Sequence, residues 1–229
     1  MYTLYIANRN YSSWSLRPWV LMRALGIPFD EEQRFFGPGS NREAFSLFSP
    51  SGQVPCLHDG DGTVVWDSLA IVEYLAERHA GVWPAEAAAR AWARCAAAEM
   101  HGGFSALRNT CPMSCGIKVR LHELSPALAQ DIARIDALWG EGLARFGGPF
   151  LAGDRFSAAD AFFAPVAFRV NSYGLSLSAP AAAYAARLLA LPAMGEWLAG
   201  ALAETQREAG HEADVAAVGS VVEDLRAKI

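Results

Sequence analysis

The first 80 residues alternate between short runs that favour strands and longer runs with helical spacing. Residues 2–6 (YTLYI) alternate as a half-buried strand does, and residues 16–25 (LRPWVLMRAL) repeat their apolar positions at helical spacing. Gly26 and Pro28 are typical residues for the end of that helix. A strand followed by a helix therefore opens the chain.

The same alternation continues to about residue 80. FDEEQRFF is consistent with a second strand, SNREAFSLFSP with a short helix ended by Pro50, and VPCLHD and TVVW with a hairpin around GDG. DSLAIVEYLAERH then forms an amphipathic helical pattern. The resulting order, β-α-β-α-β-β-α, predicts an α/β sandwich over residues 1–80.

After a connection near residues 80–85 the pattern becomes alanine-rich, and strand periodicity is lost. SPALAQDIARIDALWGEGLARF places its apolar residues on one helical face, and its Ser-Pro start is a helix-start signal. Ser157 and Asp160 in FSAADAFFAPVAFRV form a capping-box pattern, for which we predict a structural role. A polar break after residue 206 precedes a possible last helix. We therefore predict an all-helical second domain over residues 86–229.

Composition excludes several classes of function. Of the 229 residues, 52% are hydrophobic and 19% charged, which is typical of a folded protein with a buried core. The net charge of −5, without a Lys/Arg run, argues against nucleic-acid binding. No apolar stretch approaches the ~20 residues that span a bilayer, and no signal-peptide pattern opens the chain. The four cysteines include no CxxC pair, so we expect reduced thiols, no metal and a cytoplasmic location.

A cluster of serines, YSSWSLRPW, stands between the first strand and the first helix. Pro18 has no N–H and is tolerated best in the first helical turn, which predicts Ser15 as the N-cap. Ser12 and Ser13 then lie in the preceding turn. A helix N-terminus favours an anion, and a hydroxyl there can donate a hydrogen bond to it. The alternative is that the serines only cap and turn the chain.

Two further signals have a similar double interpretation. In GQVPCL, the Val54–Pro55 step enters a strand; a cis bond there would turn the Val54 backbone towards an extended peptide ligand, whereas a trans proline would only start the strand. In WDSLAIVEYL, Asp67 and Ser68 are good cap residues. They could equally bind the charged groups of a ligand.

Together the three signals resemble the cytosolic glutathione transferases over nearly the whole chain. SSWSLR resembles the SSCSWR signature of the zeta class, the maleylacetoacetate isomerases. QVP followed by DSLAIVEYL resembles the family's glutathione-site pattern, and FSAADAFFAPV resembles its second-domain capping box. The resemblance implies a fold with an α/β thioredoxin-like N-terminal domain plus an all-α C-terminal domain.

The resemblance also implies a role for each matching residue. Ser12, five residues before Arg17, would donate a hydrogen bond to the sulfur of glutathione, with Ser13 as the close alternative. The backbone of Val54, before Pro55, would pair with the cysteinyl part of glutathione. The γ-glutamyl end would be bound by Asp67 and Ser68, with Gln53 assisting.

For the second substrate, the resemblance implies a small electrophile in a pocket that includes Trp14, Arg108, Arg169 and Tyr173. Surface arginines and a tyrosine at the edge of the core are the alternative interpretation of the last three. Trp14 occupies the position of the zeta-class cysteine, which favours a zeta-like transferase over a true isomerase.

The implied protein is an enzyme, a serine-type glutathione transferase that uses glutathione as cosubstrate and forms a homodimer. A glutathione-dependent cis–trans isomerase and a non-catalytic glutathione-binding module remain as alternatives. A thiol redox protein is disfavoured, because the junction between the first strand and helix carries no cysteine.

Overall fold

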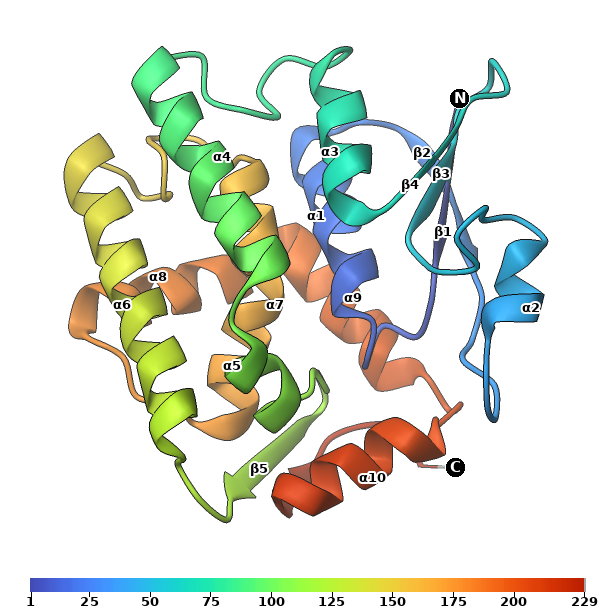
Figure 1. The fold of residues 1–229 in the computed structure, drawn as a ribbon, viewed down its shortest axis with the longest axis vertical. Helices are drawn as coiled ribbons and strands as arrows, with labels where there is room; N and C mark the ends of the chain where they lie inside the picture. The colour runs from blue at the N-terminus through green and yellow to red at the C-terminus, as the bar shows by residue number, and fades with distance from the viewer. Residues whose placement is uncertain (229) are drawn as a thin grey trace.

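The N-terminal part of the chain is an α/β layer built in the predicted order. The computed structural model describes residues 1–228 (Figure 1). The elements are β1 (Tyr2–Ile6), α1 (Ser13–Leu25), β2 (Phe29–Gln33), α2 (Arg42–Ser46), β3 (Cys56–His58), β4 (Val64–Trp66) and α3 (Ser68–Ala76). The sheet order is β2-β1-β3-β4. β1 and β2 are parallel, so α1 is the crossover between them, whereas β3 and β4 are antiparallel.

The rest of the chain is mainly helical. Its helices are α4 (Ala87–Gly102), α5 (Ser105–Thr110), α6 (Pro126–Phe146), α7 (Ala158–Tyr173), α8 (Ala179–Leu189), α9 (Pro192–Ala203) and α10 (Ala209–Val218). The predicted Ser-Pro start of α6 is confirmed, because the Ser125 hydroxyl accepts from the backbone N–H of Leu128 at 3.2 Å. The described fold is that of a thioredoxin-like domain joined to a helical domain.

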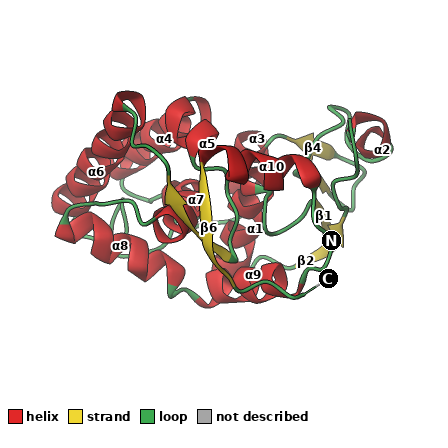
Figure 2. Cartoon of the chain, turned by 90° about the horizontal axis from the view of Figure 1, so that it is seen from below, coloured by secondary structure: helices red, strands yellow, loops and turns green. Residues whose placement is uncertain are grey.

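One feature corrects the prediction that the second domain is all-helical. β5 (Ile117–Leu121) pairs with β6 (Gly219–Asp224) in an antiparallel ribbon, seen in yellow in Figure 2. Ile117 and Val119 are buried on one face of this ribbon. β5 is short and its partner strand lies about a hundred residues away, so no local hydrophobic period indicated the pair. The predicted last helix is α10, and the chain then returns as β6.

Helix α7 lies at the centre of the molecule and is almost entirely buried. It packs against α4 and α8 in its own domain and against α1 of the first domain. The capping box at its start is present: the Asp160 carboxylate accepts from the backbone N–H groups of Ser157, at 2.9 Å, and Leu151, at 3.0 Å. It also accepts from the Tyr184 hydroxyl at 2.8 Å. These bonds satisfy a fully buried acid, which supports the structural role predicted for Ser157 and Asp160.

The connection between the domains is part of the core. Val82 and Trp83 are buried, and the carbonyl of Val82 accepts from the backbone N–H of Ala158 at 2.8 Å. We keep residues 1–80 and 86–229 as the proposed limits of the two domains, since the chain passes from α3 to α4 between them. Over residues 1–228, no helix combines the length and the hydropathy that crossing a membrane requires.

Candidate functional site

A cavity of about 900 Å³ lies between the two domains. The first domain lines it with the start of α1, the segment before β3 and the start of α3. The second domain contributes α4, α5, α7 and α10. Most of the predicted site residues meet here: Ser12, Ser13, Trp14, Gln53, Val54, Pro55, Asp67, Ser68, Arg108 and Arg169.

The start of α1 differs from the prediction by three residues. The N-cap is Ser12, not Ser15: the Ser12 Oγ accepts from the backbone N–H of Ser15 at 3.4 Å and donates to the Ser15 Oγ at 2.7 Å. The Ser15 Oγ in turn accepts from the backbone N–H of Ala7 at 3.3 Å. The prediction failed because it placed Pro18 in the first turn, whereas the helix contains Pro18 further along.

This hydrogen bonding distinguishes the two candidate hydroxyls. The hydroxyl of Ser12 is used inside the protein, in its contact with Ser15. Ser13 is the first helical residue, is buried and lines the cavity, and its hydroxyl has no hydrogen-bond partner within residues 1–228. Of the two, Ser13 is thus the hydroxyl that is free to donate into the cavity.

The segment before β3 brings backbone to the cavity. The Val54–Pro55 peptide bond is cis, which was one of the two alternatives that the sequence left open. Gln53, Val54 and Pro55 all line the cavity, as does the start of α1.

The start of α3 presents a carboxylate and a hydroxyl. Asp67 is the N-cap, and its Oδ1 accepts from the backbone N–H groups of Leu69, at 2.8 Å, and Ala70, at 3.3 Å. Its φ of 75° lies in the left-handed region, which Asp tolerates better than most residues. Its Oδ2 lies 3.5 Å from the Nε2 of His101. The hydroxyl of Ser68 is buried and has no partner among the described residues, so it can bind a ligand.

Arg108 and Arg169 line the opposite wall without any carboxylate partner. Arg169 donates from Nε to the carbonyl of Cys111 at 2.8 Å, and Arg108 donates from Nε to the carbonyl of Gly103 at 2.9 Å. Within residues 1–228 neither forms an ion pair. Burial and the neighbouring charge of Arg108 lower the pKa of Arg169 to about 10, so it stays charged at neutral pH. These two charges favour an anionic ligand group.

Of the two aromatic residues predicted for the substrate pocket, Trp14 lines the cavity and Tyr173 does not. The half-exposed indole of Trp14 lines the cavity, with the Arg108 guanidinium 4.6 Å from its ring centre. Tyr173 is not among the cavity residues; its hydroxyl donates to the carbonyl of Pro112 at 2.8 Å. Tyr173 therefore lies outside the cavity that the other predicted residues line, and nothing in its position supports the predicted contact with substrate. Arg169 and Arg108 are also not the surface arginines of the alternative interpretation, because Arg169 is buried and Arg108 half-buried.

Arg17, in α1, served in the sequence analysis only to locate Ser12, five residues before it. It is fully buried, and none of its three guanidinium nitrogens has a partner among the described residues. Its guanidinium lies between the rings of Trp14, at 4.2 Å, and Phe162, at 4.9 Å. Burial, together with Arg108 and Arg169, holds the pKa of Arg17 well below its usual range, while Asp67 opposes this shift.

Other cavity residues were missed by sequence reasoning: His101, Asn109, His211 and Asp214. His101 stands beside Asp67, and burial lowers its pKa. His211 and Asp214 come from α10, which follows the predicted polar break and carried no motif. Among residues 1–228, no group of three or more His, Cys, Asp or Glu could hold a metal ion.

Comparison with protein families assigns both domains. Residues 11–78 match the glutathione S-transferase N-terminal domain, and residues 123–200 match the glutathione S-transferase C-terminal domain. A curated relative is the glutathione S-transferase-like protein OpS6 of Beauveria bassiana. It is 27% identical over 180 residues, which cover 71% of this chain and 76% of the relative.

Solved structures share the fold. A glutathione transferase homologue from Burkholderia, with bound glutathione, has a TM-score of 0.65 and 21% identity, covering 87% of this chain and 97% of that one. A glutathione S-transferase from Rhodospirillum rubrum F11 has a TM-score of 0.67 and 20% identity, covering 94% and 99%. At these identities the likeness concerns the fold.

Proposed function

The chain belongs to the glutathione S-transferase superfamily by both of its domains, and on that premise we propose that it is a serine-type, zeta-like glutathione transferase. The observation that carries the proposal is the free hydroxyl of Ser13 at the N-terminus of α1. It faces the same cavity as Val54 and the start of α3. This arrangement can bind a small thiol peptide and stabilise its thiolate.

We propose that glutathione lies along the wall of the first domain. The buried hydroxyl of Ser68 and the N-terminus of α3 suit the γ-glutamyl carboxylate, and the carboxylate of Asp67 suits the ammonium group. The backbone of Val54 would pair with the cysteinyl part, with Gln53 beside it. This placement brings the sulfur to the start of α1.

At the start of α1, two effects favour the thiolate. A free thiol has a pKa near ~8.5 and is mostly protonated at neutral pH. The helix N-terminus stabilises an anion by ~0.3–1 kcal/mol, up to ~2 when partly buried, and a hydrogen bond to a charged group contributes ~1.5–3 kcal/mol. At ~1.36 kcal/mol per pKa unit, these effects lower the pKa by ~1–3 units. We assign the hydroxyl to Ser13, because that of Ser12 is engaged with Ser15.

The second substrate would be a small electrophile that carries an acidic group. Arg108 and Arg169 offer two charges without carboxylate partners, and Trp14 offers an aromatic face beside them. The same observation favours the alternative function, a glutathione-dependent cis–trans isomerase of an unsaturated diacid. Both functions use the same thiolate and differ in what happens after it attacks.

A panel of substrates with glutathione tests the proposal. It contains a maleyl-type diacid, a chloro-nitroaromatic and a hydroperoxide, and glutathione binding is measured in parallel by calorimetry. Turnover of any of these supports a transferase, and a dominant rate with the diacid supports the isomerase. Glutathione binding without turnover of any of them would instead support a non-catalytic binding module.

We also propose that the protein works as a homodimer in the cytoplasm. Its four cysteines are free thiols, which suits a reducing compartment. Leu47 at the end of α2 is 89% exposed, so the first domain presents an apolar side chain that a second copy could cover. Analytical ultracentrifugation measures the assembly, and a monomer at micromolar concentration would contradict the dimer.

A further inference from the structure

The C-terminal segment supplies a wall of the cavity that the proposed function does not use. Residues 201–228 lie beyond the range that matches the C-terminal family domain. Helix α10 lies at the lower edge of the molecule in Figure 1, packs against β6, and brings His211 and Asp214 to the cavity. Of these two side chains, His211 carries the imidazole, whose ring nitrogens can accept or donate a hydrogen bond.

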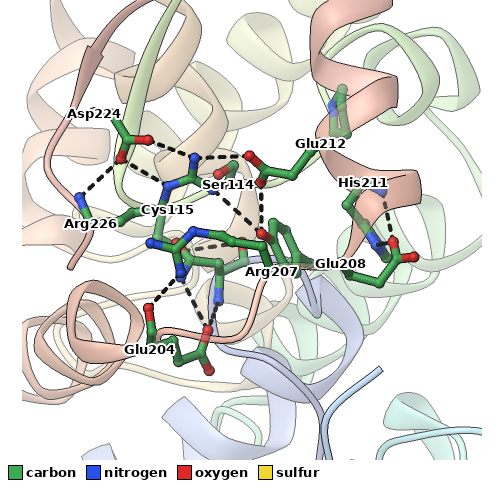
Figure 3. A network of polar contacts seen from close by, with 12 residues as sticks. Ser114, Cys115, Glu204, Arg207, Glu208, His211, Glu212, Asp224 and Arg226 are labelled. Atoms are coloured by element: carbon green, nitrogen blue, oxygen red, sulfur yellow. Dashed lines mark hydrogen bonds and ion pairs between the residues drawn. The ribbon is translucent and has the colours of Figure 1, made fainter. Parts of the chain in front are cut away.

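The imidazole of His211 has a fixed tautomer. Glu208, the N-cap of α10, accepts from the backbone N–H of Gly210 at 3.0 Å and from that of His211 at 2.7 Å. Burial opposes its charge, but these hydrogen bonds lower the pKa of Glu208, so it is a carboxylate. The same carboxylate lies 2.7 Å from the Nδ1 of His211 (Figure 3). A carboxylate only accepts, so Nδ1 carries the hydrogen and Nε2 of the neutral ring carries the lone pair.

The ring of His211 is also fixed in place. It stacks on Tyr11 with 4.8 Å between ring centres, and on Phe36 with 5.3 Å. The hydroxyl of Tyr11 donates to Glu212 on the same helix at 2.7 Å. Arg226 donates to Glu212 at 2.6 and 2.9 Å, as Figure 3 shows. The ring of His211 is thereby packed against Tyr11, which directly precedes Ser12 and Ser13 in the chain.

We propose that His211 is a catalytic base that accepts the proton of the glutathione thiol, an inference that rests on the proposed function. The S–H bond breaks, its electron pair stays on sulfur as the thiolate, and an N–H bond forms at Nε2. The carboxylate of Glu208 stabilises the resulting imidazolium. After the thiolate attacks, the proton passes to the leaving group or to the carbanionic product, which returns His211 to its neutral form.

Two observations favour this proton over others on glutathione. The Nε2 of His211 has no hydrogen bond within residues 1–228, so its lone pair is free. The ammonium group has Asp67 as its partner in the proposed binding mode, and the cysteinyl amide has the backbone of Val54. The thiol is the donor that remains, and the proposed binding mode places it at Ser13, two residues along the chain from Tyr11, whose ring stacks on His211.

The titratable and charged groups around His211 come from four segments. Its own helix and cap contribute Glu208, Glu212 and Asp214, the loop before α1 contributes Tyr11, and the C-terminal segment contributes Arg226. Arg42, beyond Phe36, lines the same cavity. Within residues 1–228, the carboxylate of Glu208 is the one group hydrogen-bonded to the ring, and it faces Nδ1, on the far side of the ring from the lone pair of Nε2.

The variant His211→Phe tests the inference, because phenylalanine keeps the aromatic stack and removes the base. The readouts are kcat/KM against pH with a neutral chloro-nitroaromatic and the ultraviolet thiolate absorbance of bound glutathione. General-base catalysis contributes ~10²–10⁴-fold. Because Ser13 and the helix still stabilise the thiolate, we expect a fall of ~10- to 100-fold near neutral pH. The fall should narrow as the pH approaches ~8.5, where solvent ionises the thiol.

The matched control is His122→Phe, at a histidine that directly follows β5, bonds Ser220 and does not line the cavity. Glu208→Gln is the second variant, and we expect it to show a smaller fall with the same pH trend. A wild-type rate and pH profile in His211→Phe, or in Glu208→Gln if His211→Phe does not fold, would overturn the inference alone. Absence of glutathione binding and turnover in the wild-type protein would overturn the proposed function, and this inference with it.

Discussion

The hydroxyls of Ser12 and Ser13 differ by one position along the chain, and alanine variants should separate their roles. Ser13, at the start of α1, is buried, and its hydroxyl has no partner among residues 1–228, so Ser13→Ala removes one charge-assisted hydrogen bond to the proposed thiolate. Such a bond contributes ~1.5–3 kcal/mol. At ~1.36 kcal/mol per pKa unit, the pKa of the bound thiol should rise by ~1–2 units. Turnover near neutral pH should fall by ~10- to 100-fold.

Ser12→Ala should act on the fold instead. It removes the N-cap of α1, which costs ~0.5–2 kcal/mol in the free energy of unfolding. It also removes the hydrogen bond to the buried Ser15 hydroxyl at 2.7 Å. For a chain of this size, each kcal/mol lowers the melting temperature by ~2–4 °C. The pKa of the bound thiol should change little.

The assay is a pH titration of the thiolate absorbance of the glutathione complex, paired with a thermal melt of each variant. Glutathione affinity, measured by calorimetry, should stay near the wild-type value in Ser13→Ala, since the other contacts remain. If Ser12→Ala raises the thiol pKa and Ser13→Ala does not, the assignment moves to Ser12. If neither variant moves it, hydroxyl donation is not the way in which this site forms a thiolate.

Three further predictions follow from the site and its surroundings. In steady-state kinetics, Arg169→Met should raise KM for an acidic electrophile by ~10- to 100-fold, from the loss of ~1.5–3 kcal/mol, and leave KM for a neutral electrophile unchanged. The control is Arg134→Met, at an exposed residue paired with Glu99. An equal rise in KM for both electrophiles would refute an anion-binding role of Arg169. Asp67→Ala should weaken glutathione binding by ~10-fold or more in calorimetry, and loss of the N-cap of α3 should lower the free energy of unfolding by ~1 kcal/mol. An unchanged affinity for glutathione would show that Asp67 does not bind the ligand. The hydrogen bonds of Arg226 lower the pKa of Asp224 in the folded protein. The stabilisation from this pair is therefore present above the unfolded pKa of ~3.9 and is lost as the pH falls through the folded pKa of Asp224. In Arg226→Met, the free energy of unfolding should fall less steeply below pH ~4, and an unchanged slope would contradict this link between Asp224 and stability.

Local signals predicted the fold well where the deciding interactions lie within a few residues. Gly26 adopts the left-handed conformation that ends α1, as its position after the apolar run indicated. The capping box of Ser157 and Asp160 depends on bonds three residues apart, and it formed as predicted. The order of the first seven elements follows from the same kind of local pattern.

Two of the misses have a common physical cause, which is distance along the chain. The β5–β6 ribbon joins Ile117 to Asp224, and no local period reveals a partner so far away. His211 reaches the cavity because α10 packs against Tyr11, two hundred residues earlier. The identity of the N-cap was decided by the Ser15 hydroxyl, which bonds back to Ala7 at the end of the first strand. This third miss is local: hydrogen bonds that span three and eight residues override the preference of Pro18 for the first turn.

The buried connection at Val82 and Trp83 limits how the two domains can move relative to each other. A connection that is packed and hydrogen-bonded to the start of α7 cannot act as a hinge, because bending it would expose Trp83 and break the bond between Val82 and Ala158. The two domains should therefore melt as one cooperative unit, with a single calorimetric transition. Exchange of the second domain for that of another protein would succeed only if the backbone amide at position 158 kept its carbonyl partner.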